Sequence, residues 1–286
     1  MANVPGPKPS LRTQWLGARL RDLRKVNKFS LRDAGEFLTR EASTIGRYEA
    51  GEFPIRRGDL LGLMTLYGVS EESERSELLE LCDEAWRKGW WDQHRNDLGS
   101  HFINVPWLES RATTAKAFEH KLINGLLQTP DYAETVITAV SEPGTSQDQI
   151  RRWVNLRMER KLVLQRQEQF QFTCIFEESV LQRPVGSDAL MQAQLESLLD
   201  LCELPNIEIQ VVPTSIGPHA AFPGAFVLYT MPSPYPSVAH AETLGGTVYV
   251  EEPKLQKFQI AWNDIQDKAL TPHQSSDLIA NQLKEY

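Results

Sequence analysis

The chain has 286 residues, of which 41% are hydrophobic and 24% are charged, a composition that excludes intrinsically disordered and collagen-like proteins. At about 150 residues per domain this length indicates two domains, and three widely separated cysteines argue against a disulfide framework and favour a reducing, cytoplasmic compartment. The first ten residues lack the apolar stretch of a signal peptide, and six prolines interrupt the longest uncharged run, so no membrane helix is expected.

Charge is distributed unevenly along the sequence. The formal net charge is −8, but the first 60 residues contain 12 basic and 7 acidic side chains, whereas residues 61–286 contain 18 basic and 31 acidic ones. A basic N-terminal region on an acidic remainder predicts a polyanionic partner for the N-terminal region alone. The alternative interpretation is a chance variation in surface charge.

The N-terminal third of the chain is predicted to be helical. Residues 1–10, with three prolines and one glycine, are expected to form a flexible tail. Apolar residues at helical spacing then predict an all-α domain of about five helices over residues 11–88. Within it, Ser30 and Asp33 form a capping pair for the second helix, and Gly51 ends a third helix over residues 42–50.

The remainder of the chain is predicted to be an α+β domain. Residues 89–105 show no periodicity and are expected to link the two domains. The second domain, residues 106–286, is expected to serve regulation and dimerisation. Helices are predicted at 131–140, 147–166, 188–202, 253–269 and 272–284. Strands are predicted at 170–176, 207–212, 225–231, 238–243 and 247–250.

Residues 30–51 (SLRDAGEFLTREASTIGRYEAG) show the pattern of a helix-turn-helix unit. Two short helical segments flank a tight turn, and small Ala34 and Gly35 stand where the helices would cross. In such units the second helix lies in the DNA major groove. Ile45 and Tyr48 would then face the protein core. The residues expected to contact bases are Ala42, Ser43, Thr44 and Arg47.

Arg47 is expected to bind the O6/N7 edge of a guanine, which discriminates between bases by about 1–3 kcal/mol. The residues expected to contact phosphates, and so to position the helix, are Lys28, Ser30, Arg40, Arg56 and Arg57. Arg47→Ala should therefore lose preference at one base pair, whereas Arg57→Ala should weaken binding to all sequences alike. The alternative is an ordinary helical hairpin with a purely structural role.

Residues 30–51 resemble the cro/repressor class of regulators, also called the xenobiotic-response-element class. The matching positions are Ala34, Ile45, Arg47, Glu49 and Gly51. The sequence departs from the class at Leu31, where many members have Gln, and at Glu41, where Ser or Thr normally caps the recognition helix. Glu41 still favours a helix N-terminus electrostatically, but it would repel a nearby phosphate.

Several later segments resemble the C-terminal domain of a large actinobacterial regulator family, described as antitoxin-like and similar to the WhiJ-type developmental repressors. These segments are residues 126–133 (LLQTPDYA), 178–186, 194–198, 217–226 (GPHAAFPGAF) and 242–250. The resemblance covers residues 12–286. It implies a DNA-binding transcriptional regulator that is dimeric and has a small partner protein encoded nearby, and it leaves the role of the C-terminal domain open.

No catalytic, metal or cofactor motif is found in the sequence, and the protein is therefore expected not to be an enzyme. HExxH, CxxC, GxSxG, P-loop and GxGxxG patterns are all absent. The Pro/Gly-rich loop 213–224, with His219 and Phe222, is the candidate position for a small-molecule effector or partner.

The predicted function is that of a cytoplasmic repressor which binds pseudo-palindromic operators as a homodimer. Two other classes of function stay open. One is an antitoxin-like interaction module that binds a small basic partner, and the other is a ligand-binding or enzymatic C-terminal domain.

Overall fold

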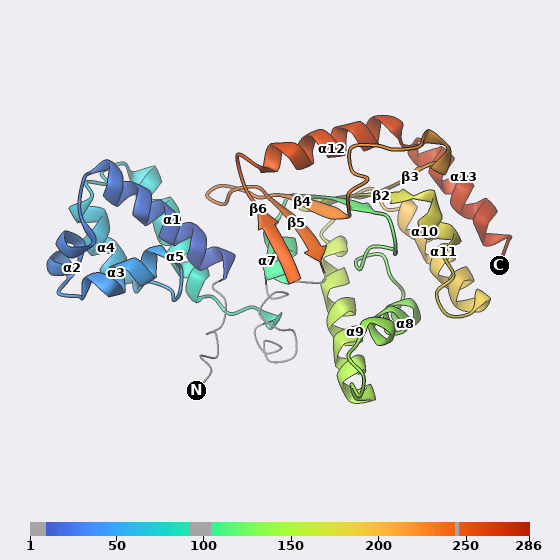
Figure 1. Cartoon of the computed structure of the whole chain (residues 1–286), viewed down its shortest axis with the longest axis horizontal. Coiled ribbons are helices and arrows are strands. Elements are labelled where there is room, and N and C mark those ends of the chain that lie inside the picture. The colour runs from blue at the N-terminus through green and yellow to red at the C-terminus, as the bar shows by residue number, and fades with distance from the viewer. Residues whose placement is uncertain (1–9, 92–103, 244–245) are drawn as a thin grey trace. The chain divides into compact units, whose positions relative to one another are not determined.

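A computed structural model describes residues 10–91, 104–243 and 246–286 (Figure 1). The chain divides into two compact units, Met1–Asn104 with Pro232–Tyr235, and Val105–Met231 with Pro236–Tyr286. Residues 1–9 of the expected tail and residues 92–103 of the expected linker lie outside the described residues. None of the described helices has the length and apolar character needed to cross a bilayer.

The first unit contains the five predicted helices. They are α1 (Leu11–Val26), α2 (Leu31–Leu38), α3 (Ala42–Glu49), α4 (Arg57–Leu66) and α5 (Glu72–Trp86). The predicted apolar face of α1 packs inward, since Leu16 and Leu20 are buried with Ile45 of α3 and Leu60 of α4. The helical periodicity therefore predicts both the elements and their inward faces.

The second unit is built on a six-stranded sheet of order β3-β2-β1-β4-β5-β6. The strands are β1 (Thr114–Glu119), β2 (Gln171–Glu177), β3 (Ile207–Val212), β4 (Phe226–Thr230), β5 (Val238–Thr243) and β6 (Gly246–Val250). β1, β2 and β3 are parallel, whereas β4, β5 and β6 pair in antiparallel fashion. β3 and β6 are thus the two edge strands.

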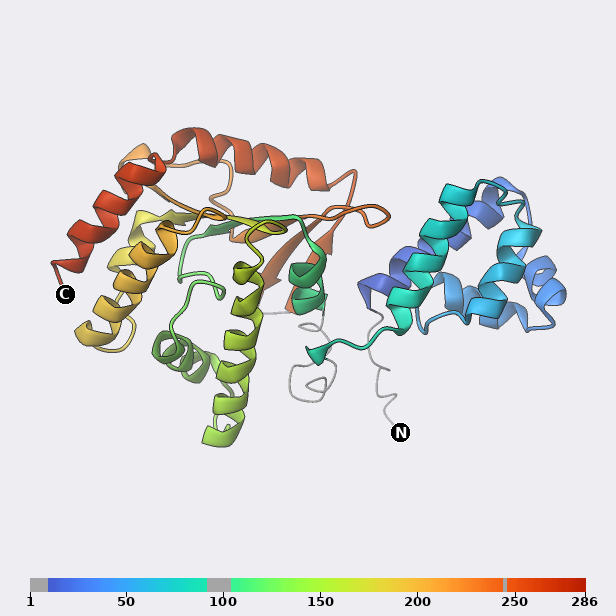
Figure 2. The same ribbon diagram turned by 180° about the vertical axis from the view of Figure 1, so that it is seen from behind.

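Helices cover both faces of this sheet (Figures 1 and 2). α12 (Leu255–Lys268) covers one face, where Phe118, Phe226, Trp262 and Ile265 form a buried core. α7 (Asn104–Arg111), α9 (Gln147–Lys161) and α11 (Asp188–Cys202) lie on the other face. The remaining helices are α8 (Pro130–Val140), α10 (Glu178–Gln182), α13 (Pro272–Leu283) and the 3-10 turns Leu162–Gln165 and Thr214–Ile216.

The sequence-based prediction of the second unit missed three elements. Central strand β1 and helices α7 and α10 have no predicted counterpart, and α7 includes the last two residues of the expected linker 89–105. The predicted helix 147–166 is also too long, because α9 ends at Lys161 and a 3-10 turn follows. The α+β architecture and the other predicted strands and helices are confirmed.

Ionisable side chains are buried between the sheet and α9. Arg160 of α9 donates two hydrogen bonds, at 2.7 and 2.9 Å, to the carboxylate of Glu109 of α7. Glu119, at the end of β1, accepts a hydrogen bond of 2.7 Å from the side-chain amide of Asn124. Burial raises the pKa of Glu119 to about 8. Its carboxyl group is therefore largely protonated at neutral pH.

This raised pKa predicts a pH-dependent stability. Because the pKa of Glu119 in the folded state lies above the unfolded value, its contribution is fully present below about pH 4 and is lost as the pH rises through 8. Glu119→Gln mimics the protonated acid. The substitution should therefore raise the free energy of unfolding, relative to the wild-type protein, by about 1–3 kcal/mol more at pH 8 than at pH 5. Urea unfolding of both proteins at the two pH values tests this, and parallel pH profiles would contradict it.

Candidate nucleic-acid interface

The start of α2 is fixed by the predicted capping pair. The Ser30 hydroxyl accepts a hydrogen bond of 3.1 Å from the Asp33 backbone N–H, and the Asp33 carboxylate accepts one of 2.7 Å from the Ser30 N–H. These bonds lower the pKa of Asp33, so the carboxylate stays ionised near the positive end of the helix dipole. The capping prediction is confirmed.

The turn between α2 and α3 depends on close backbone contact. The N–H of Arg40 donates to the carbonyl of Gly35 at 2.8 Å, and Thr39 adopts a left-handed conformation with φ of 56°. A Cβ atom on Gly35 would lie 2.7 Å from the carbonyl oxygen of Arg40. Only glycine therefore fits where the two helices meet, as the small residues in the sequence predict.

α3 presents one face to the core and another to solvent. Ile45 and Tyr48 are buried as predicted, whereas Ser43 and Arg47 are exposed and Thr44 is partly exposed. Residues 43, 44 and 47 lie within one turn of each other, so they share a face of the helix. The structure therefore brings three of the four predicted base-contacting residues onto one accessible surface.

The N-terminus of α3 has no side-chain cap, because Glu41 makes no capping hydrogen bond. Within the part of the chain that the structure describes, the backbone N–H groups of Ala42 and Ser43 have no hydrogen-bond acceptor. Unpaired N–H groups at a helix start attract anions, since they add to the positive end of the helix dipole. The exposed carboxylate of Glu41 at the same end would nevertheless repel a phosphate, so these N–H groups alone do not form a phosphate site.

Arg47 is held in place by the segment that follows α3. Its Nε donates to the Glu52 carboxylate at 2.8 Å, and its guanidinium lies 4.5 Å from the centre of the Phe53 ring. The Phe53 ring in turn packs edge-on against Tyr48, with 5.1 Å between ring centroids. The Arg47 side chain remains 57% exposed, so its guanidinium can still reach a ligand.

A pocket of about 310 Å³ lies beside α3. Its lining residues are Arg40, Thr44, Tyr48, Phe53, Pro54, Arg56 and Trp86. Arg40 pairs with Asp59 at 3.3 Å, whereas Arg56 has no carboxylate partner among the described residues. The Tyr48 hydroxyl donates to Asp59 at 2.9 Å, and burial together with this bond raises the pKa of Tyr48. Two guanidinium groups and a threonine hydroxyl at one pocket form a suitable site for a phosphodiester.

The other predicted phosphate-binding residues lie elsewhere in the first unit. Lys28 is exposed between α1 and α2, and the Ser30 hydroxyl serves the α2 cap. Arg57 binds Asp83 of α5 at 2.8 and 2.9 Å and does not line the pocket. Of the five residues predicted to contact phosphates, Arg40 and Arg56 are the two that line the pocket beside α3.

Glu49 anchors the recognition helix to α1, a role that the sequence-based reasoning missed. It is 5% exposed, and its carboxylate accepts bonds of 2.6 and 2.8 Å from Arg24 of α1. Arg24 also donates to the carbonyl of Phe29 at 2.9 Å and so holds the connection to α2. The available signal was an acidic residue four positions after Ile45, on the buried face of the helix.

In the second unit, the buried side chain of His219 holds the candidate effector loop 213–224 against the protein interior. The Nε2 of His219 bonds the Glu177 carboxylate at 2.7 Å, and its Nδ1 accepts the N–H of Ala221 at 3.2 Å. The ring of His219 is therefore fully engaged within the protein, whereas Phe222 is 67% exposed. Among the described residues, no group of three or more His, Cys, Asp or Glu side chains is arranged to hold a metal ion.

Comparison with known proteins agrees with this division of the chain. A helix-turn-helix domain model matches residues 15–78, and the model of a domain of unknown function (DUF5753) matches residues 102–281. No curated protein and no solved structure matches the chain. The chain therefore belongs to the DUF5753 family and carries a helix-turn-helix domain in front of the domain that defines this family.

Proposed function

We propose that the protein is a sequence-specific DNA-binding transcriptional regulator that represses transcription by occupying its operator. The observation that carries the proposal is the shared surface of α3, on which Ser43, Thr44 and Arg47 are accessible beside the pocket of Arg40 and Arg56. In the major groove, this face of α3 would read base edges while the pocket binds phosphates.

A dimer is part of the proposal. An eight-residue recognition helix reads only a few base pairs, and two copies in successive major grooves, about 34 Å apart, would read a pseudo-palindromic operator. We place the dimer contacts and the control by a small partner or effector in the C-terminal domain, which we propose to be non-enzymatic. We also propose a cytoplasmic location, because a repressor of this kind acts on the chromosome.

Selection of bound fragments from randomised duplex DNA with the full-length protein, at about 150 mM salt, tests this function, because nonspecific phosphate binding is suppressed at that concentration. An enriched inverted repeat with half-sites about one helical turn apart is the expected result. Absence of enrichment, both with the protein alone and with the small protein encoded nearby, would contradict it.

Two arginines should have different effects on binding. Arg47→Ala should weaken the free energy of binding to the best DNA site by about 1–3 kcal/mol and reduce the preference at one base pair, because it removes a base contact. Arg56→Ala should weaken binding to all DNA sequences, because it removes a phosphate contact. It should also reduce the slope of the logarithm of affinity against the logarithm of salt concentration by about one. Fluorescence anisotropy with the selected site, its single-base variants and random DNA measures both effects.

Arg57→Ala is the matched control, because it removes the same charge one position along the chain. Arg57 lies outside the pocket, so, in contrast to the expectation from the sequence, this variant should weaken DNA binding less than Arg56→Ala does. Equal effects of Arg47→Ala and Arg56→Ala on every DNA sequence would contradict the assigned roles.

The acidic balance of the second unit favours a second role beside DNA binding. Residues 104–286 contain 14 basic and 22 acidic side chains, which suits an antitoxin-like interaction with a basic protein partner. This role concerns the C-terminal domain and is compatible with a DNA-binding N-terminal domain.

A further inference from the structure

One wall of the pocket beside α3 is apolar and comes partly from α5. Four of the seven residues that line this pocket are Tyr48, Phe53, Pro54 and Trp86, and the others are two arginines and a threonine. Trp86 is the last residue of α5. The pocket therefore extends beyond the two helices of the helix-turn-helix and their connection to α4.

Trp86 leaves much of its indole ring uncovered at this pocket. Its exposed fraction is 54%, which is high for so large an aromatic side chain. A single exposed apolar residue is common on protein surfaces, but one that lines a pocket together with Arg40 and Arg56 combines an apolar face with two positive charges. Aromatic rings and arginines are both enriched in the contact surfaces of proteins, so this combination indicates a binding surface.

α5 holds the Trp86 ring in a fixed position. The Nε1–H of Trp86 donates to the carbonyl of Ile55 at 2.8 Å, and the Sγ–H of Cys82, one turn earlier on α5, donates to the same oxygen at 3.4 Å. Ile55 is buried and directly precedes Arg56. The ring of Trp86 is thus tied to the segment that carries Arg56, so the apolar wall and this charge are placed by the same contact.

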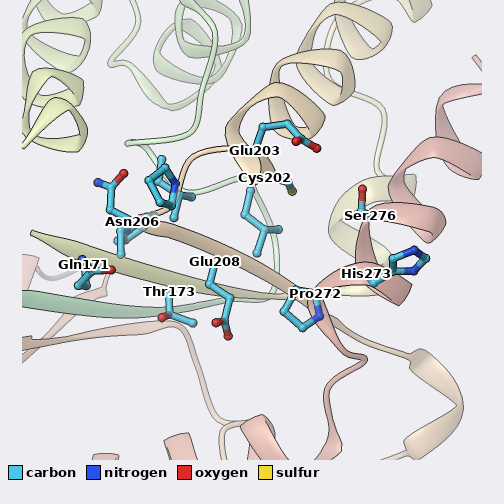
Figure 3. Close-up of a pocket in the computed structure, with 13 residues that line it drawn as sticks. Gln171, Thr173, Cys202, Glu203, Asn206, Glu208, Pro272, His273 and Ser276 are labelled. Carbon is cyan, nitrogen blue, oxygen red and sulfur yellow. The ribbon is translucent and has the colours of Figure 1, made fainter. Parts of the chain in front are cut away.

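A larger groove, of about 370 Å³, lies along β3 of the second unit and has an acidic lining (Figure 3). Figure 3 shows Glu203 at the end of α11 and Glu208 on β3, and the lining residues include no lysine or arginine. These carboxylates oppose a polyanion. In contrast, the pocket of the first unit places basic and apolar groups together beside the accessible face of α3.

The DNA backbone presents the two kinds of group that this pocket matches. Each phosphate carries the negative charge that Arg40 and Arg56 attract, and the deoxyribose next to it presents C–H groups. Such C–H groups gain free energy when they leave water for an apolar surface, and an indole face is such a surface. A sugar beside a bound phosphate therefore suits the wall that Trp86 forms.

We propose that Trp86 packs against a deoxyribose of the DNA backbone, next to the phosphate that Arg56 binds, so that α5 forms part of the DNA interface. The contact helps to position α3 and carries no base preference, because every nucleotide of DNA has the same sugar. This inference rests on the proposed DNA-binding function and adds to it a contact from outside the helix-turn-helix.

Trp86→Ala should weaken binding to the selected site and to its single-base variants alike, by about three- to tenfold, because apolar surface at the sugar returns to water. The slope of the logarithm of affinity against the logarithm of salt concentration should not change, since no charge is removed. Arg47→Ala differs because it changes the preference at one base pair, and Arg56→Ala differs because it changes the slope. Fluorescence anisotropy with the full-length protein, at several salt concentrations, separates the three patterns. A change of slope or of base preference in Trp86→Ala would contradict a sugar contact.

Hydroxyl-radical footprinting on the selected site locates the contact, because these radicals cleave DNA by removing hydrogen atoms from deoxyribose. At protein concentrations that saturate the DNA, Trp86→Ala should leave open to cleavage a deoxyribose in each half-site that the wild-type protein protects. Arg47→Ala, at the same saturation, should keep this sugar protected. Identical footprints of Trp86→Ala and the wild-type protein would overturn the inference.

Two further variants separate the ring contact from a loss of structure. Trp86→Phe keeps an aromatic face and lacks the Nε1–H, so it should bind DNA within about twofold of the wild-type affinity. A loss as large as that of Trp86→Ala would assign the effect to the hydrogen bond with Ile55 and refute the sugar contact. Phe37→Ala is the matched control, because Phe37 is 50% exposed on α2 and does not line the pocket.

Phe37→Ala should change DNA binding by less than about twofold, as expected for a surface substitution away from the site. Equal losses in Phe37→Ala and Trp86→Ala would show that neither loss reports a contact at the pocket. A wild-type protein that binds no DNA would instead contradict the proposed function. Normal DNA binding by Trp86→Ala, with a wild-type protein that binds its selected site, would overturn this inference and leave the proposed function in place.

Discussion

Glu49→Ala is expected to lower the free energy of unfolding of the N-terminal domain by about 3–5 kcal/mol, because it leaves a largely buried guanidinium without its carboxylate. Arg24 is 12% exposed at its side chain and depends on Glu49 for two of its hydrogen bonds. Hydrogen exchange measured by mass spectrometry should show faster exchange in peptides from α1, α2 and α3 and unchanged exchange in the sheet of the second unit.

Glu52→Ala is the matched control for this variant. Glu52 also forms an ion pair with an arginine at 2.8 Å, but the side chains of Arg47 and Glu52 are 57% and 51% exposed. Exposed pairs contribute at most about 1 kcal/mol, so this substitution should hardly change exchange in the same peptides. Similar losses of stability in the two variants would show that Glu49 does not anchor α3 through a buried ion pair.

Arg160→Leu is expected to destabilise the C-terminal domain by about 3–5 kcal/mol. The substitution strands the Glu109 carboxylate, whose side chain is 3% exposed, between α7 and the sheet. Arg151→Leu, on the same helix, is the control, because its partner Asp148 is 74% exposed and the pair is worth less than about 1 kcal/mol. Urea unfolding measures both changes.

A double variant tests whether the stranded charge causes the loss. Glu109→Leu/Arg160→Leu removes both charges, and apolar replacements of a buried pair are often neutral or stabilising. It should therefore regain much of the stability that Arg160→Leu loses. If the destabilisation of the double variant equals the sum of the destabilisations by Glu109→Leu and Arg160→Leu alone, then packing, and not the unpaired carboxylate, determines the loss.

Local signals explain why the helix-turn-helix region was predictable from sequence. The Ser30–Asp33 cap, the close approach at Gly35 and the inward spacing of Ile45 and Tyr48 each involve residues within a few positions of one another. Strand β1 carries no such signal. Its alternate residues Ala115 and Ala117 are weak strand formers, and their place in the sheet depends on pairing with β2 and β4 far along the chain.

The candidate site was predictable in its residue types but not in their pairing. The sequence identifies Arg40, Arg47, Arg56 and Arg57 as basic residues near α3, yet Arg40 and Arg57 are paired with carboxylates far along the chain. Arg57 lies 26 positions from its partner Asp83, and Arg40 lies 19 positions from Asp59. Long-range contacts of this kind have no periodic pattern, so they cannot be derived from spacing alone.

If Arg47 contacts a base as proposed, Glu52 and Phe53 compete with that base for its guanidinium. To bind a base, the Arg47 guanidinium would have to give up its hydrogen bond to the Glu52 carboxylate and replace it with bonds to acceptors on the base edge. A guanine, with two acceptors in the major groove, compensates for this exchange, whereas a cytosine edge, which presents a donor, does not. In the proposed complex, the loss of the Arg47–Glu52 ion pair would add to the discrimination against incorrect base pairs, because only a guanine would replace the lost acceptor.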